Sequence, residues 1–124
     1  MNSGFIRLPR DIQDHWTYTA KSNKPHGGFD FGQAWIDLLL LANHTDVTKY
    51  VNGEMKTFKA GSVYRSQLEL SRRWGWNDRK KVRRFLEELE NQNDITFTSD
   101  SQGTVIRILD PVRWGICPEQ KQEQ

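Results

Sequence analysis

Apolar side chains recur with helical spacing in three segments of this chain. Residues 30–43 are apolar on nearly every side, which predicts a central and buried helix. Residues 66–74 place Leu70 and Trp74 on one face, one helical turn apart. Residues 78–90 carry apolar side chains at i, i+3, i+4 and i+7, which predicts a helix with a single buried stripe. This stripe consists of Val82, Phe85, Leu86 and Leu89.

The second and third segments have helix boundary signals close to one another. Ser66 and Glu69 have the spacing of a capping box, in which each side chain accepts a hydrogen bond from the other residue's amide. Gly75 suits the left-handed position that follows a helix, and Asn77 can cap the next helix. Two capped helices joined by residues 74–77 predict a helix-turn-helix.

A β-hairpin is predicted before the helix-turn-helix. Residues 47–51 and 54–59 flank Asn52-Gly53, and Asn-Gly is the preferred pair for a two-residue hairpin turn. Residues 60–64 are expected only to connect this hairpin to the second helix.

A second hairpin is predicted directly after the third helix. Residues 95–109 alternate in polarity on both sides of a turn at residues 100–103. A helix-turn-helix followed by such a hairpin is the winged-helix arrangement. We therefore expect an α+β, mainly helical fold: a winged helix-turn-helix with a β-hairpin wing and an N-terminal arm.

The chain has room for one domain. Its 124 residues, 35% of them hydrophobic, are enough for a single core. We expect residues 1–28 to form an N-terminal arm and loop, residues 29–112 the winged-helix domain, and residues 113–124 a C-terminal tail or linker.

The N-terminal arm is unusually apolar for a segment outside a compact domain. Large apolar side chains at Phe5, Ile6, Leu8 and Trp16 are predicted to supply a self-association interface, so that the chain forms a homo-oligomer. The alternative is that the arm folds back on its own core.

Positive charge is concentrated around the helix-turn-helix. The net charge is only +2, but seven of the 18 Lys and Arg residues lie between positions 72 and 84, and three acids follow at Glu87, Glu88 and Glu90. This order opposes the helix macrodipole, which favours acids at the start of a helix and bases at its end. A helix that inserts its first half into a DNA groove needs basic side chains there.

Double-stranded DNA is accordingly the predicted partner. Trp76 lies in the turn beside the expected groove, where packing within the core is favoured over a contact with DNA, although both roles stay open. The residues predicted to bind DNA are Ser66, Arg72, Arg73, Trp76, Asn77, Arg79, Lys80, Lys81, Arg83, Arg84 and Arg107.

Other chemistry finds little support in the sequence. The three histidines are far apart and have no metal-ligand spacing with the single cysteine, Cys117. There is no phosphate-binding glycine loop and no nucleophile motif, so we expect neither an enzyme nor a cofactor. No apolar run is long enough for a membrane span, and the first ten residues do not resemble a signal peptide. A cytoplasmic protein is the expectation.

Three stretches resemble one family. GFIRLPRDIQDHW (residues 4–16), AWIDLLLLANHTD (34–46) and SQLELSRRWGWNDRKKVRRFLEELE (66–90) are similar to phage replisome organisers and the related DnaD-like N-terminal domains. The resemblance implies an origin-binding winged helix that self-associates and helps to load the replicative helicase through a loader protein. The loader-binding part of such proteins usually lies C-terminal to this domain, so we expect helicase loading to need a part outside these 124 residues.

The expected function is therefore double-stranded DNA binding in the initiation of phage or prophage replication. One alternative is a winged-helix transcriptional regulator. A second is a protein-interaction or inhibitor module that keeps the fold without binding DNA, which the acids beside the basic patch leave open.

Overall fold

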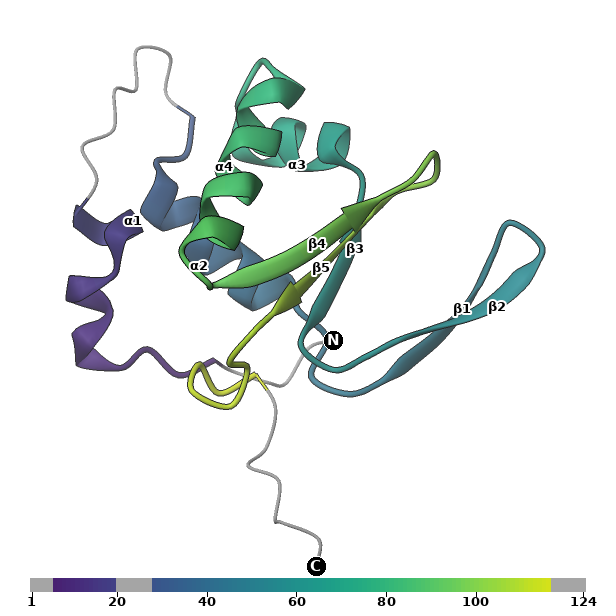
Figure 1. Cartoon of the computed structure of the whole chain (residues 1–124), viewed down its shortest axis with the longest axis horizontal. Coiled ribbons are helices and arrows are strands. Elements are labelled where there is room, and N and C mark those ends of the chain that lie inside the picture. The colour runs from purple at the N-terminus through teal and green to yellow at the C-terminus, as the bar shows by residue number, and fades with distance from the viewer. Residues whose placement is uncertain (1–5, 20–27, 117–124) are drawn as a thin grey trace, which may run out of the picture.

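The computed structural model describes residues 6–19 and 28–116. In this part the chain is an α+β protein with four α-helices, one 3₁₀ helix and two antiparallel sheets (Figure 1). The elements in order are η1 (Arg10–Asp14), α1 (Trp16–Thr19), α2 (Phe31–Leu41), β1 (Val47–Val51), β2 (Glu54–Phe58), β3 (Ser62–Arg65), α3 (Gln67–Trp74), α4 (Arg79–Asn91), β4 (Ile95–Ser99) and β5 (Thr104–Ile108). None of these helices is long and apolar enough to cross a membrane.

The two helices that flank the turn begin and end largely as their sequences predict. Ser66 and Glu69 form the expected capping box at the start of α3, and Gly75 ends the helix with a left-handed φ of 70°. The cap of α4 differs: Asp78, not Asn77, occupies this position, and its carboxylate accepts from Lys80 N at 2.8 Å. A cap must reach the second or third amide of its helix, and α4 begins one residue too late for Asn77 to do so.

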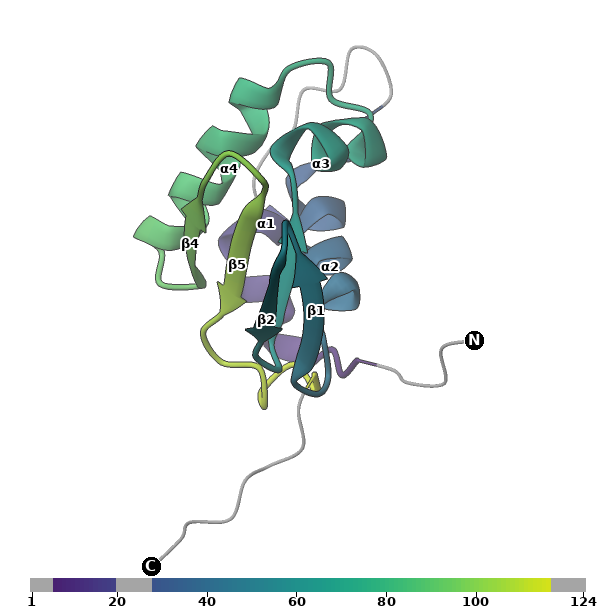
Figure 2. The same cartoon turned by 90° about the vertical axis from the view of Figure 1, so that its right-hand side faces the viewer.

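The first hairpin, β1–β2, is confirmed. Asn52 and Gly53 have φ angles of 53° and 87°, the two positive values that a type I′ turn requires. The hairpin forms a two-stranded sheet of its own and extends away from the helices (Figures 1 and 2).

The second sheet has three strands in the order β3-β5-β4. The β4–β5 hairpin matches the predicted one at residues 95–109. Strand β3 was expected to be a simple connection, and that expectation is wrong. Its four residues pair in register with β5, from Ser62 opposite Arg107 to Arg65 opposite Thr104. Such a short strand owes its existence to a partner that lies far along the chain, so local alternation gives no signal for it.

The core lies between the helices and the inner face of the three-stranded sheet. The predicted stripe of α4 is confirmed, since its four apolar residues are at most 2% exposed. Trp35 of α2 and Trp74 of α3 are fully buried with them.

The core also includes segments that the sequence placed outside the domain. Trp114 and Ile116 are each 4% exposed, and the Trp114 ring packs edge-on against Trp35 at 5.6 Å. The compact unit therefore reaches at least residue 116, and the predicted boundary at 112 is wrong. The predictions for Phe5, for residues 1–5 and 20–27 of the arm and loop, and for residues 117–124 of the tail lie outside the described residues.

Candidate nucleic-acid interface

The turn between α3 and α4 is fixed by a buried tryptophan. Trp76 is 5% exposed, its Nε1 donates to Phe29 O at 2.8 Å, and its ring packs edge-on against Trp74 and Phe85. Trp76 therefore packs within the core, which is the role that was favoured for it, and its place among the predicted DNA-binding residues is corrected. Its ring and its indole tie the turn between α3 and α4 to the core and to Phe29.

The Arg73 side chain also forms contacts within the folded chain. Its Nε and Nη2 donate to the two carboxylate oxygens of Asp37 on α2, at 2.6 and 2.9 Å. Trp74 Nε1 donates to the same carboxylate at 2.8 Å. Hydrogen bonding to Asp37 raises the pKa of Arg73. Because two of its donors are engaged in this contact, we assign Arg73 first to the fold and not to a phosphate contact.

Most other cations of α3 and α4 point into solvent. Lys81 lies over the Trp76 ring at 4.5 Å, and Arg83 pairs with Glu87 at 3.3 Å. The remaining ones are exposed, and their side chains form no ion pair or hydrogen bond within residues 6–19 and 28–116. These free cations are Arg72 on α3 and three residues in the first half of α4, which are Arg79, Lys80 and Arg84. We call the four together the α4 surface.

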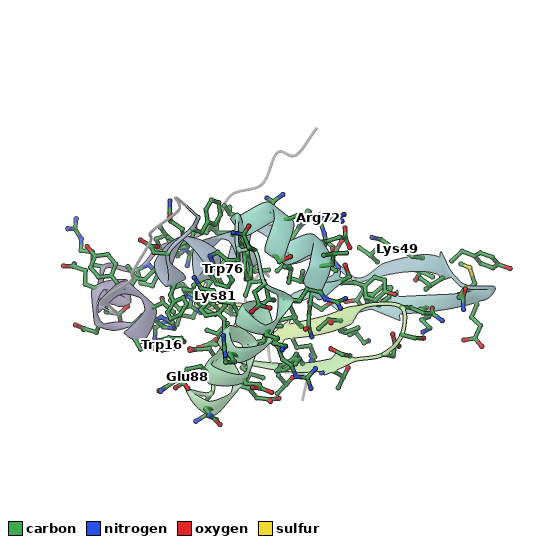
Figure 3. All side chains as sticks on the ribbon, turned by 90° about the horizontal axis from the view of Figure 1, so that it is seen from above. Trp16, Lys49, Arg72, Trp76, Lys81 and Glu88 are labelled. Atoms are coloured by element: carbon green, nitrogen blue, oxygen red, sulfur yellow. The ribbon has the colours of Figure 1, made fainter. Side chains whose placement is uncertain are left out.

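The charge order along α4 makes this surface basic at one end. The first turn of α4 contains no acid and the last turn no base. At the far end, Glu88 accepts from Gln92 Nε2 at 2.9 Å, and Glu90 accepts from Phe97 N at 3.4 Å. In Figure 3, Lys81 lies toward the α3–α4 turn beside Trp76, while Glu88 lies farther down the helix. The acids thus serve contacts within the chain, and the first half of α4 keeps its positive charge.

Ser66 and Asn77 have different surroundings. Ser66 Oγ accepts from Glu69 N at 3.0 Å, so its first role is to cap α3. Next to it, Gln67 Nε2 donates to Ser99 Oγ at 3.1 Å, which joins the start of α3 to the end of β4. Asn77 is exposed in the turn. Ser66 therefore lies beside the β4–β5 hairpin, and Asn77 lies beside the start of α4.

The turn of the β4–β5 hairpin is tightly built. Asp100 accepts from the amides of Gln102 and Gly103 at 2.8 and 3.1 Å, and these bonds lower the pKa of its carboxyl. A Cβ at Gly103 would lie 2.8 Å from the Tyr64 ring, so a larger residue would push this ring aside. The turn thus has a defined shape and presents an acid rather than a base.

Arg107 does not join the α4 surface. It is the only Lys or Arg in residues 95–109, and it alternates along β5 with the buried Ile106 and Ile108. Its side chain therefore lies on the outer face of the sheet, away from the helices. There it lines a groove of about 320 Å³ with Lys56 and Lys59 of the first hairpin segment.

Sequence reasoning missed the lysines of the first hairpin. Lys49 and Lys56 are directly opposite in the β1–β2 register, and Figure 3 shows Lys49 on the projecting hairpin. The sequence did contain a signal for them. Once Asn52-Gly53 is taken as a two-residue turn, counting residues outward on both strands places Lys49 opposite Lys56.

The predicted self-association residues are partly used within the chain. Trp16 Nε1 donates to Asp94 Oδ2 at 2.9 Å, and its ring lies 5.9 Å from the rings of Phe31 and Phe85. Ile6 packs against the core, while Leu8 is 48% exposed. For Trp16 and Ile6 the prediction is therefore corrected: this part of the arm folds back on its own core.

The neighbouring His15 strengthens the attachment of the arm. Its Nε2 lies 3.0 Å from Asp94 Oδ1, and its ring stacks on Trp35 at 5.0 Å. Two consecutive arm residues thus share one carboxylate, just before β4 begins. Among residues 6–19 and 28–116, no group of three or more His, Cys, Asp or Glu side chains could hold a metal ion.

Comparison with known proteins finds no matching family model, no similar curated protein and no similar solved structure. The functional interpretation therefore depends on the sequence and on this geometry.

Proposed function

We propose that the chain is a double-stranded DNA-binding domain of the winged-helix type, with α4 as the recognition helix. The single observation that carries this proposal is the α4 surface: four exposed cations without an acidic partner in the described part of the chain. Three of them, Arg79, Lys80 and Arg84, stand at the basic end of α4, whose charge order costs stability, and Arg72 lies near the end of α3. Selection for folding alone does not favour this order, whereas phosphate binding does.

The element order supports the same proposal. Helix α3, the Gly75–Trp76 turn, helix α4 and the β4–β5 hairpin follow one another as they do in a winged helix. In that class the second helix of the pair enters the major groove with its first residues toward the bases. Three of the four free cations lie in the first half of α4, so DNA would meet the basic end of the helix.

We further propose that the domain acts in initiating phage or prophage replication, where it self-associates on DNA and has a helicase loader as a partner. The three stretches similar to replisome organisers support this role. A transcriptional regulator would use the same surface. A protein-interaction module is less well supported, because the acids of α4 engage neighbours within the chain while its cations stay free.

A salt titration tests DNA binding. Four phosphate contacts would make log affinity for a labelled duplex fall with log salt at a slope of about −3.6. The double variant Lys80→Ala/Arg84→Ala should reduce this slope by about 1.8 in magnitude. Arg10→Ala removes one exposed charge in η1 and serves as the matched control. A slope near zero for the parent protein would contradict DNA binding.

The biological role needs a second experiment. Footprinting on DNA from the source genome should find protection within a replication origin. Protection confined to promoter regions would support the transcriptional regulator instead.

A further inference from the structure

The β1–β2 hairpin carries a pair of lysines that does not help the hairpin to fold. Lys49 and Lys56 are cross-strand partners, and like charges in directly opposite positions destabilise a strand pair. Neither forms an ion pair within residues 6–19 and 28–116, whereas Lys59 at the base pairs with Asp46 at 3.7 Å. A repulsive pair on an exposed hairpin suggests an anionic partner.

The base of the hairpin fixes its direction. The Phe58 ring stacks on Tyr64 of β3 at 4.6 Å, and Phe58 is only 6% exposed. At the same base, Asp46 Oδ1 accepts from Ala60 N at 2.8 Å, and this bond joins the residue before β1 to a residue just after β2. The lysines are therefore presented from an anchored base and not from a loose loop.

The β4–β5 hairpin, which has the position of a wing, carries little positive charge. The β4–β5 hairpin offers one cation, Arg107, and an acid in its turn. Lys56 lies close enough to this turn for its charge to contribute, as the smallest cause, to the lowered pKa of Asp100. Lys56 and Lys59 also line the groove that contains Arg107. The basic surface beside the β4–β5 hairpin thus belongs mostly to β1–β2.

The three candidate elements follow one another in space. In Figures 1 and 3 the first turns of α4, the β4–β5 turn and the tip of the β1–β2 hairpin lie in sequence along one side of the molecule. We propose that the β1–β2 hairpin is a second DNA-contacting element, in which Lys49 and Lys56 bind phosphates beyond the site of α4 and the β4–β5 hairpin. This inference rests on the proposed function.

The other face of the hairpin suits a different binding partner. Tyr50 and Met55 are cross-strand partners there and are 72% and 65% exposed. An apolar pair of this kind could also meet a second copy of the chain. Lys49 and Lys56 point from the opposite face, so a contact between copies at Tyr50 and Met55 would leave both lysines free for phosphate.

Duplex binding by Lys49→Ala/Lys56→Ala tests the inference. The full chain is titrated with a labelled random-sequence duplex at several salt concentrations, and its sedimentation is measured alongside. We expect weaker binding and a salt slope smaller in magnitude by about 1.8, as for the loss of two phosphate contacts. The melting temperature should stay the same or rise, because a repulsive pair is removed. Arg10→Ala should change neither slope nor melting temperature, and Glu54→Gln on the same hairpin should tighten binding.

The outcomes separate this inference from the proposed function. If the α4 variants weaken binding and the hairpin variant does not, the hairpin does not contact DNA while α4 still does. If the parent itself shows no salt-dependent binding, both proposals fail. If the hairpin variant binds less only because a parent dimer has become a monomer, the hairpin is an interface between copies, and the inference is overturned.

Discussion

Arg72 and Arg73 are neighbours in sequence, yet the structure gives them opposite roles. Arg72 is exposed and belongs to the α4 surface, whereas Arg73 binds Asp37 through two hydrogen bonds. We therefore expect Arg73→Ala to reduce stability and to leave the salt dependence of DNA binding unchanged. Arg72→Ala should do the reverse.

The cost of Arg73→Ala can be worked out from its contacts. The Asp37 side chain is 10% exposed, so removing its cation leaves a nearly buried carboxylate with Trp74 Nε1 as its remaining side-chain donor. Breaking a buried ion pair costs about 3–5 kcal/mol. The Arg73 side chain is 44% exposed, and solvent screening lowers the figure to roughly 2–4 kcal/mol. For a domain of this size that corresponds to a loss of roughly 8–15 °C in melting temperature.

Urea unfolding followed by circular dichroism measures the expected loss of stability in Arg73→Ala. Arg72→Ala is the matched control, because an exposed substitution usually changes the free energy of unfolding by no more than about 0.5 kcal/mol. Salt titrations of DNA binding, made under conditions in which each variant is folded, measure the salt dependence of binding in the two variants. Equal stabilities of the two variants would refute the assigned role of the Asp37 contact. A reduced salt slope in folded Arg73→Ala would show that this arginine binds phosphate after all.

Three further substitutions or conditions test the core, the arm and the β4–β5 turn. Leu86→Ala should lower the free energy of unfolding by about 2–5 kcal/mol, since this side chain is fully buried; normal urea unfolding would mean that α4 faces the other way. Asp94→Ala removes the shared acceptor of His15 and Trp16 and should cost roughly 1–3 kcal/mol with a red shift of tryptophan fluorescence. An unchanged spectrum would argue that the arm is not held there. The lowered pKa of Asp100 means that its turn is stabilised above the ordinary aspartate pKa of about 3.9, and that this contribution is lost as the pH falls through the lowered value. The amide resonances of the turn should follow that titration in NMR spectra, and shifts that appear only above pH about 5 would contradict the assignment.

Local patterns in the sequence were sufficient for the elements that carry their own signals. The stripe of α4, the capping box of α3, the left-handed Gly75 and the Asn52-Gly53 turn all appear where the pattern puts them. Each of these features is decided by residues within one or two helical turns or across a short hairpin. Periodicity and turn chemistry act over the same range, so they identify such elements without knowledge of the rest of the fold.

Tertiary structure decided which of the predicted site residues remain free. Arg73 looks like Arg72 in the sequence, and only the approach of Asp37, 36 residues earlier, sets it apart. Trp16 was predicted to supply a self-association interface, and only the approach of Asp94, 78 residues away, gives its indole a partner within the chain. Strand β3 and the groove that Arg107 shares with the lysines of the first hairpin likewise come from pairings between distant parts of the chain. Hydrogen bonds and charge screening depend on distances of a few ångströms, and the sequence does not fix those distances until the chain has folded.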